Sequence, residues 1–299
     1  MMEIRCEVQT RDILGECPVW NPADSSLYWV DIERKLLQRF HRASGESRCH
    51  TFPERIGAFA FHRPDTIVAA LESGIYAYNT GNASLSVLAA PECGAGTRFN
   101  DGKCDRGGRF WAGTMDLNAR ERLGSLYCLD ASLECRRVVR GIGIPNGLAW
   151  SPDGATFYYA DSLERTIYAC DFDSGAGSIS NRRVFANTRD MPGLPDGSTV
   201  DEEGYLWNAQ CGGWQLVRYA PDGSIDRTVP LPVQYPTSCT FGGWNGATLY
   251  VTTAVWDLDE VQLAAQPFAG GVLALEPGVR GGAERWFSHS GLHGGGDHP

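Results

Sequence analysis

Three oxygen-bearing side chains occupy equivalent places in the sequence and form a set that suits a metal ion. Glu16 lies in G-E-C-P-V-W, Asn146 in P-N-G-L-A-W and Asp196 in P-D-G-S-T-V. Each precedes an apolar, strand-like residue by four positions, namely Trp20, Trp150 and Val200. Carboxylate and amide oxygens favour a hard divalent cation such as calcium, magnesium or manganese, with zinc less favoured.

Two carboxylates that share a narrow space raise one another's pKa unless a cation or a proton lies between them. Taken singly, Glu16, Asn146 and Asp196 are ordinary turn residues. The segment T-R-F-N-D-G-K-C-D (97–105) adds Arg98, Asn100 and an Asp at 101. Their donors suit a ligand rich in hydroxyl or carbonyl oxygen, although Arg98 could instead form an ion pair with the neighbouring acid.

A repeat of about 40–50 residues must position these side chains. Each unit has a short apolar strand, a Pro/Asp/Gly turn, an aromatic-rich strand, a polar break and a third strand. Six units are found, at residues 19–46, 59–83, 103–132, 148–177, 199–224 and 239–277. One antiparallel meander cannot bury both of its faces, so repeats of this length predict an all-β, six-bladed β-propeller with four-stranded antiparallel blades.

The alignment of the repeats places the candidate residues in a ring. The innermost strand of every blade lines the central channel, so equivalent positions gather around one axis. The first strands of the six units can be aligned on one residue each, such as Trp20 or Trp150. The position four residues before it is occupied, in chain order, by Glu16, Gly57, Asn100, Asn146, Asp196 and Thr237. The leading segment 3–10 alternates polar with apolar residues, and we expect it to pair with the last unit and close the ring, which removes an exposed edge. We expect residues 1–288 to form a single propeller domain and residues 289–299 to be a disordered tail.

Composition excludes several classes of partner. The 299 residues carry a net charge of −10 and no run of Lys or Arg, so neither nucleic acid nor an anionic membrane is expected as a partner. The N-terminal segment has early charges and no apolar stretch of signal-peptide length, which predicts a cytoplasmic protein. The ten Cys form no C-x-x-C pair, and we interpret them as reduced, strand-buried residues. The third to fifth units contain no His, so acid–base chemistry at the ring falls to carboxylates.

The sequence resembles the family of gluconolactonase, regucalcin (senescence marker protein) and related sugar lactonases. The matching motifs, in the family's order, are L-G-E-C-P-V-W (14–20), Y-W-V-D-I (28–32), R-F-N-D-G-K-C-D (98–105), W-A-G-T-M (111–115), N-G-L-A-W-S-P-D-G (146–154), Y-Y-A-D-S (158–162) and P-D-G-S-T-V-D-E-E-G (195–204). The resemblance implies a six-bladed propeller with one divalent metal on Glu16, Asn146 and Asp196. It also implies substrate contacts at Arg98 and Asn100. Asn118 stands in the loop 116–124 where some family members carry an acidic contact.

The function expected from this resemblance is hydrolysis of a sugar-acid (aldono-) lactone to the free aldonic acid. Asp196 is expected to be the catalytic base, with calcium as the first choice of metal and magnesium, manganese, iron or zinc as alternatives. We expect a monomer whose partner is a small-molecule sugar lactone. The competing interpretations are a non-catalytic metal- or calcium-binding propeller, and an aryl-ester or organophosphate lactonase with Trp214, Trp244 and Trp256 as apolar walls. The sequence leaves the lactone, its ring size and the native metal open.

Overall fold

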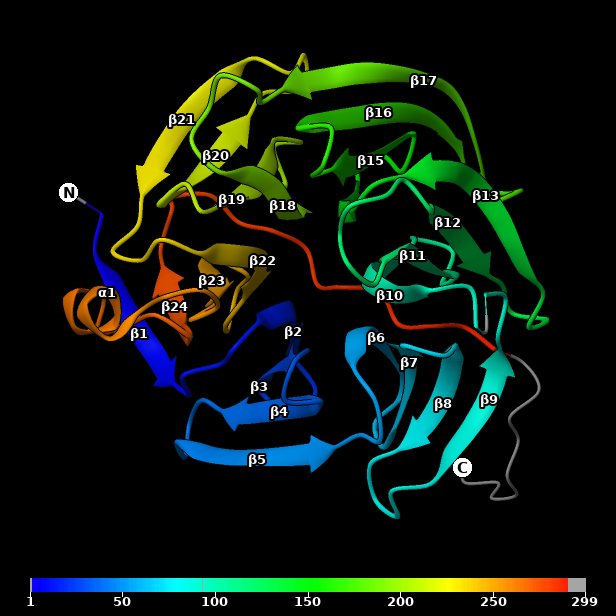
Figure 1. Cartoon of the computed structure of the whole chain (residues 1–299), viewed down its shortest axis with the longest axis horizontal. Coiled ribbons are helices and arrows are strands. Elements are labelled where there is room, and N and C mark those ends of the chain that lie inside the picture. Colours follow the sequence, from blue (N-terminus) through cyan, green and yellow to red (C-terminus); the bar gives the residue numbers. More distant parts are fainter. Residues whose placement is uncertain (1, 93, 290–299) are drawn as a thin grey trace.

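The strands are arranged as blades around a central axis. The computed structural model of the chain describes residues 2–92 and 94–289. Its strands form six four-stranded antiparallel sheets that radiate from one axis (Figure 1). The predicted all-β, six-bladed propeller with four-stranded meander blades is confirmed. One short helix in the described part, α1, follows the sixth blade's second strand.

Each of the first five blades is a meander of four consecutive strands. Blade 1 consists of β2 (Gly15–Asn21), β3 (Ser26–Asp31), β4 (Leu36–His41) and β5 (Glu46–Thr51). Blade 2 consists of β6 (Ile56–Arg63), β7 (Thr66–Leu71), β8 (Ile75–Asn79) and β9 (Leu85–Ala89). Blade 3 consists of β10 (Thr97–Cys104), β11 (Phe110–Asp116), β12 (Gly124–Leu129) and β13 (Cys135–Ile142). Blade 4 consists of β14 (Pro145–Trp150), β15 (Thr156–Asp161), β16 (Thr166–Asp173) and β17 (Ser178–Asn187). Blade 5 consists of β18 (Leu194–Val200), β19 (Leu206–Cys211), β20 (Gln215–Tyr219) and β21 (Ile225–Pro230).

The sixth blade joins the two ends of the strand sequence. It contains β22 (Pro236–Gly242), β23 (Thr248–Thr253), β24 (Gly271–Leu275) and, as its outer strand, β1 (Ile4–Gln9), with α1 (Glu260–Ala265) between β23 and β24. β1 pairs antiparallel with β24, from Ile4 opposite Leu275 to Gln9 opposite Gly271. The expected closure of the ring by the N-terminal segment is confirmed, and it covers the edge that β24 would otherwise expose.

The hydrophobic core lies between neighbouring blades. Trp111 of blade 3 packs edge to face on Trp150 of blade 4, with ring centroids 6.0 Å apart. Tyr28 and Phe61 meet edge to face between blades 1 and 2, with ring centroids 4.9 Å apart. Tyr250 of blade 6 stacks on Trp20 of blade 1 at 5.6 Å. Burial of a large apolar side chain contributes roughly 1.5–3 kcal/mol. Because these contacts cross the gaps between sheets, each blade is stabilised by its neighbours on both sides.

Recurrent Asp residues hold the turns between the first and second strands. Asp105 accepts hydrogen bonds from the backbone of Gly107 and Arg109 and from Trp111 Nε1 at 3.1 Å. Asp201 does the same in blade 5, where Trp207 Nε1 lies 2.9 Å from its Oδ2. These buried carboxylates are fully engaged in hydrogen bonds and have a structural role.

The residues after the last strand cross one end of the central channel. This C-terminal segment, residues 276–289, passes across the middle of the ring in Figure 1. Gly281 forms a bridge with Asp201 of blade 5, whereas Phe287 N donates to Phe61 O of blade 2 at 2.6 Å. Between these ends, Glu284 Oε1 lies 2.9 Å from Lys103 Nζ in a largely buried ion pair. The segment therefore closes the channel at this end, an arrangement that the repeat pattern did not predict.

Nine of the ten Cys lie in the described part, and all nine are free. Five of them are buried as expected, but the expectation of burial is wrong for Cys49, which is exposed on an outer strand, and Cys6, Cys135 and Cys211 are only partly buried. Cys93 and the tail residues 290–299, for which disorder was expected, lie outside the described residues. His289, the first residue of that expected tail, is described, and its Nδ1 lies 2.6 Å from Ala131 O. Within residues 2–92 and 94–289, no helix has the length and apolar character needed to cross a membrane.

Candidate active site

All six ring residues lie on innermost strands, at a point where the strand register is broken. The pairing of β2 with β3 shifts after Glu16, and the pairing of β14 with β15 shifts after Asn146. In β18 the shift surrounds Asp196. Such bulges turn a side chain out of the regular alternation. Residues Cys17 and Gly147, which follow two of the ring residues, have φ values of 47° and 64°. A register shift of this kind occurs at all six ring positions and sets the orientation of each ring residue.

The structure brings every sequence-predicted site residue to one cavity of about 280 Å³. It lies at the end of the channel opposite the C-terminal segment, because Arg98 and Lys103 occupy opposite ends of β10. Its lining includes Glu16, Arg98, Asn100, Asn118, Asn146 and Asp196. The two ring residues that do not line the cavity are Thr237 and Gly57. Thr237 donates to Gly15 O, and Gly57 lies so close to the backbone of β10 that a Cβ there would collide with it.

A chain of amide contacts orders the floor of the cavity. Arg98 donates to Asn100 Oδ1 at 2.9 Å, and Asn100 Nδ2 donates to Asn146 Oδ1 at 2.8 Å. Asn146 Nδ2 donates in turn to Ser162 Oγ at 2.9 Å, and Ser162 donates to the carbonyl of Pro195. These contacts fix the amide orientation of Asn146, with its Oδ1 directed towards Asn100 and its Nδ2 towards Ser162.

The two ring carboxylates are buried together and resist ionisation. Burial raises the pKa of Glu16 well above its ordinary value, and the negative charges of Asp196 and Asp101 raise it further. Burial and Asp101 likewise raise the pKa of Asp196 to about 8. Asp196 Oδ1 has no hydrogen-bond partner among the described residues, although it is buried. An unpartnered buried carboxylate oxygen is costly unless a ligand satisfies it.

Asp101 has a different role from the ring carboxylates. Its Oδ1 accepts from Gly102 N at 2.8 Å, and its Oδ2 accepts from Leu148 N at 3.2 Å in the next blade. It therefore holds the bulge that follows Asn146. Arg98 makes no ion pair with Asp101 or with any other acid in the described part, so the proposed ion pair between them is not formed.

Arg98 is a buried cation that faces the cavity without an acidic partner. Burial and the nearby Arg55 lower its pKa to about 10. Arg55 also lines the cavity, but it is engaged by Glu72 at 2.9 Å and by Glu33 at 3.5 Å. The guanidinium of Arg98 is therefore the group at this floor with donors available for a ligand oxygen.

The rim of the cavity is more apolar than the sequence indicated. Leu117, Leu194 and Trp256 line it and are more than a third exposed. Among the three proposed Trp walls, Trp256 alone lies here. The expectation for Trp244 is wrong: this residue is 98% exposed and lines a separate hollow beside Trp20.

Ser162 and Trp256 are two site residues to which the sequence alone assigned no ring position. Ser162 lies in the quoted Y-Y-A-D-S motif, directly after β15, and motif position was its only available signal. In the loop 116–124, Asp116 accepts from Arg120 N and Glu121 N, both at 3.0 Å, and so shapes the loop that carries Asn118.

The donor set fits a divalent cation. Among the described residues no group of three His, Cys, Asp or Glu side chains could hold a metal ion. The candidate ligand set is the two carboxylates of Glu16 and Asp196 with the amide oxygen of Asn146, which line the same cavity. Two features fit a site that holds a positive charge. Asp196 Oδ1 is buried without a partner in the described part, and the pKa values of both ring carboxylates are raised. Two carboxylates and one amide supply oxygen ligands for a hard ion.

The fold and cavity define a class of protein, a six-bladed propeller with an acid and amide ring at one end of its channel. The family model described as SMP-30/Gluconolactonase/LRE-like region matches residues 14–255. The chain belongs to this family, and the resemblance found in the motifs is confirmed.

Individual relatives agree with this assignment. A 6-deoxy-6-sulfogluconolactonase of Pseudomonas putida is 35% identical over 95% of this chain and 98% of its own. An L-arabinolactonase of Azospirillum brasilense is 38% identical over 93% of both chains. The crystal structure of a calcium-binding protein, regucalcin, from Agrobacterium tumefaciens superposes with a TM-score of 0.91 at 30% identity, over 96% of this chain and 97% of that one. Sugar lactonases among the relatives support lactone hydrolysis.

Proposed function

We propose that this protein hydrolyses the lactone of a sugar acid to the free aldonic acid with the help of one divalent cation, calcium being the first choice. The observation that carries the proposal is the buried, unpartnered Asp196 Oδ1 beside Glu16 and the Asn146 amide at the floor of the cavity. Glu16, Asn146 and Asp196 would hold the cation. When bound, such a cation polarises a carbonyl group and stabilises developing negative charge.

The side chains of the cavity divide the remaining work. Asp196 accepts a proton from the attacking water and returns it to the leaving ring oxygen. Arg98, joined to Asn100 Oδ1 at 2.9 Å, presents its remaining N–H donors to the hydroxyl groups of the sugar acid. Asn100, whose Nδ2 donates to Pro145 O and Asn146 Oδ1, offers the second lone pair of its carbonyl oxygen as an acceptor. Asn118 contributes an amide from the loop at the cavity wall. The apolar rim at Leu194 and Trp256 limits access of water to the bound ring.

One assay tests this function directly. Release of acid is measured with gluconolactone, L-arabinolactone and 6-deoxy-6-sulfogluconolactone, and with an aryl ester as the probe for the alternative hydrolase. The protein is stripped of metal, and calcium, magnesium, manganese, iron or zinc is added back singly. We expect hydrolysis of at least one lactone that depends on an added ion. Hydrolysis of the aryl ester alone, or of no substrate with any ion, contradicts the proposal.

We expect the stability of the metal-free protein to fall as pH rises towards 8. The pKa of Asp196 is about 8 in the folded chain against an ordinary value of 3.8, so the folded state keeps a proton that the unfolded state has lost. The stabilisation is complete at low pH and disappears as the folded carboxylate ionises. Thermal unfolding between pH 5 and 9, settings that bracket this value, measures the effect.

Added calcium should restore much of the stability that is lost by pH 8, because it binds the ionised carboxylates of the folded state. Sodium at equal ionic strength serves as the control, since it screens charge without preferring the site. A stability profile that calcium leaves unchanged would contradict the assignment of Glu16 and Asp196 to a cation site.

A further inference from the structure

A second cavity, of about 240 Å³, lies at the end of the channel closed by the C-terminal segment. It is formed by the ends of β10, β14 and β18 opposite to those that carry Arg98, Asn146 and Asp196. Its lining includes Lys103, Arg106, Trp150, Thr199, Glu284 and Arg285. None of these residues reaches the candidate active site, so the cavity has no part in the chemistry proposed above.

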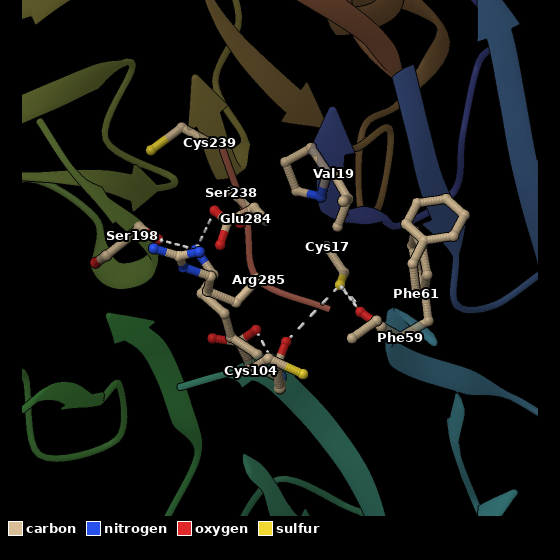
Figure 2. A pocket seen from close by; sticks show the side chains of 15 residues that line it. Cys17, Val19, Phe59, Phe61, Cys104, Ser198, Ser238, Cys239, Glu284 and Arg285 are labelled. Atoms are coloured by element: carbon tan, nitrogen blue, oxygen red, sulfur yellow. Dashed lines mark hydrogen bonds and ion pairs between the residues drawn. The ribbon is translucent and has the colours of Figure 1, made fainter. Parts of the chain in front are cut away.

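Positive charge dominates this second cavity. Its three cations face one carboxylate, and that carboxylate is already engaged, because Glu284 Oε1 lies 2.9 Å from Lys103 Nζ and accepts from Thr240 Oγ1. Figure 2 shows Glu284 and Arg285 of the C-terminal segment beside Ser198, in the neighbouring part of the channel. A positive hollow is an exception in a chain whose net charge is −10.

The two arginines of this cavity hold unused donors. Arg285 makes no side-chain hydrogen bond or ion pair within residues 2–92 and 94–289, and Arg106 uses only its Nε, on Ser151 O at 3.0 Å. Burial and the charge of Arg285 lower the pKa of Arg106, while the charges of Asp153 and Glu284 act in the opposite direction with a smaller effect. Two guanidinium groups that repel one another across a hollow are stabilised by an anion between them.

Trp150 forms part of the wall of this cavity, although its indole Nε1 lies beneath that wall and does not reach the cavity. Its side chain lines the cavity and is 6% exposed, and its indole Nε1 is a buried donor without an acceptor in the described part of the chain. By contrast, the buried indoles of Trp111 and Trp207, on the second strands of blades 3 and 5, both donate to a carboxylate. A buried indole N–H normally finds such an acceptor.

We propose that this cavity is a second binding site, which takes the anionic oxygen group of a small molecule, a phosphate or a carboxylate, between Arg106 and Arg285. The forked donors of arginine match both groups in two-point contacts. The volume admits a small ion or a short sugar acid and excludes a folded partner. Lys103 stays paired with Glu284, so the net positive charge of the cavity comes from Arg106 and Arg285.

The test measures binding of inorganic phosphate and, separately, of gluconate to the full-length protein by titration calorimetry in calcium-free buffer at constant ionic strength. The two probes distinguish a phosphate ligand from a carboxylate ligand. The variant R106Q/R285Q removes both unused cations from exposed side chains. We expect its dissociation constant for the bound anion to rise roughly tenfold or more, because charged hydrogen bonds are lost.

The matched control is R140Q/R189Q, which removes the same charge from two exposed arginines outside the cavity. We expect this control to bind the anion as the unmodified protein does, and we expect both variants to unfold at a similar temperature. The proposal is overturned if neither anion binds the unmodified protein, or if the control loses as much affinity as R106Q/R285Q. Equal losses would show a general effect of net charge.

Discussion

Replacement of Asp196 by Asn is expected to lower turnover of the best lactone roughly 10²–10⁴-fold, even at saturating calcium. The amide keeps the size of the side chain and one carbonyl oxygen, so an ion can still occupy the site when it is supplied in excess. It cannot take a proton from water at neutral pH, because it has no basic oxygen comparable to a carboxylate. The measurement is turnover as a function of calcium concentration.

The matched variant is Asn146→Ala, which removes a neutral ligand and leaves the base in place. It also removes the acceptor of Asn100 Nδ2 and the donor to Ser162 Oγ. We expect a large part of its loss to be recovered by added calcium, whereas the loss in Asp196→Asn persists. If Asp196→Asn regains nearly full turnover at high calcium, Asp196 serves as a ligand only and another group must accept the proton.

Replacement of Glu284 by Ala is expected to lower the free energy of unfolding by about 3–5 kcal/mol. The side chains of Lys103 and Glu284 are 18% and 15% exposed, so loss of the acid leaves a buried ammonium group without its partner. Lys103 Nζ keeps only the carbonyl of Ser198, at 3.1 Å. Urea unfolding of the full-length protein measures the change.

The control for this prediction is the double replacement Lys103→Met/Glu284→Leu. It exchanges the ion pair for apolar side chains of similar length, and such exchanges are often neutral or stabilising. We expect the double variant to recover a large part of the stability that Glu284→Ala loses. A Glu284→Ala protein as stable as the unmodified chain would show that the C-terminal segment is held by its backbone contacts, such as that between Phe287 N and Phe61 O.

The ring of site residues could be predicted because the propeller repeats its geometry along with its sequence. Each blade presents its innermost strand to the channel in the same way, so one alignment placed Glu16, Asn146 and Asp196 near a common axis. The structure adds that all three lie at breaks in strand register. A break of this kind depends on contacts with the next blade, such as that between Asp101 and Leu148 N, and it leaves no regular pattern in the sequence.

Features that depend on distant pairs escaped prediction for a related reason. Lys103 and Glu284 are separated by 181 residues, and neither lies in a motif that marks the other. The sequence offered Trp214, Trp244 and Trp256 alike as apolar walls. Trp256 lines the cavity whereas Trp244 does not, and this difference depends on loop conformation, which hydrophobic pattern does not determine. The position of the C-terminal segment across the channel could be found only from its contacts with blades 2, 3, 5 and 6.

The closure of blade 6 has a consequence for the order of events during synthesis on the ribosome. β1 is made first, but its partner β24 is made more than 260 residues later, because Gln9 pairs with Gly271. At roughly 5–20 residues per second, the nascent β1 waits on the order of 10–50 s for its partner. An unpaired strand can associate with other nascent chains during that interval. Arg5 and Glu7, which form an ion pair at 2.9 Å in the folded protein, place charges on this strand and oppose such association while it waits.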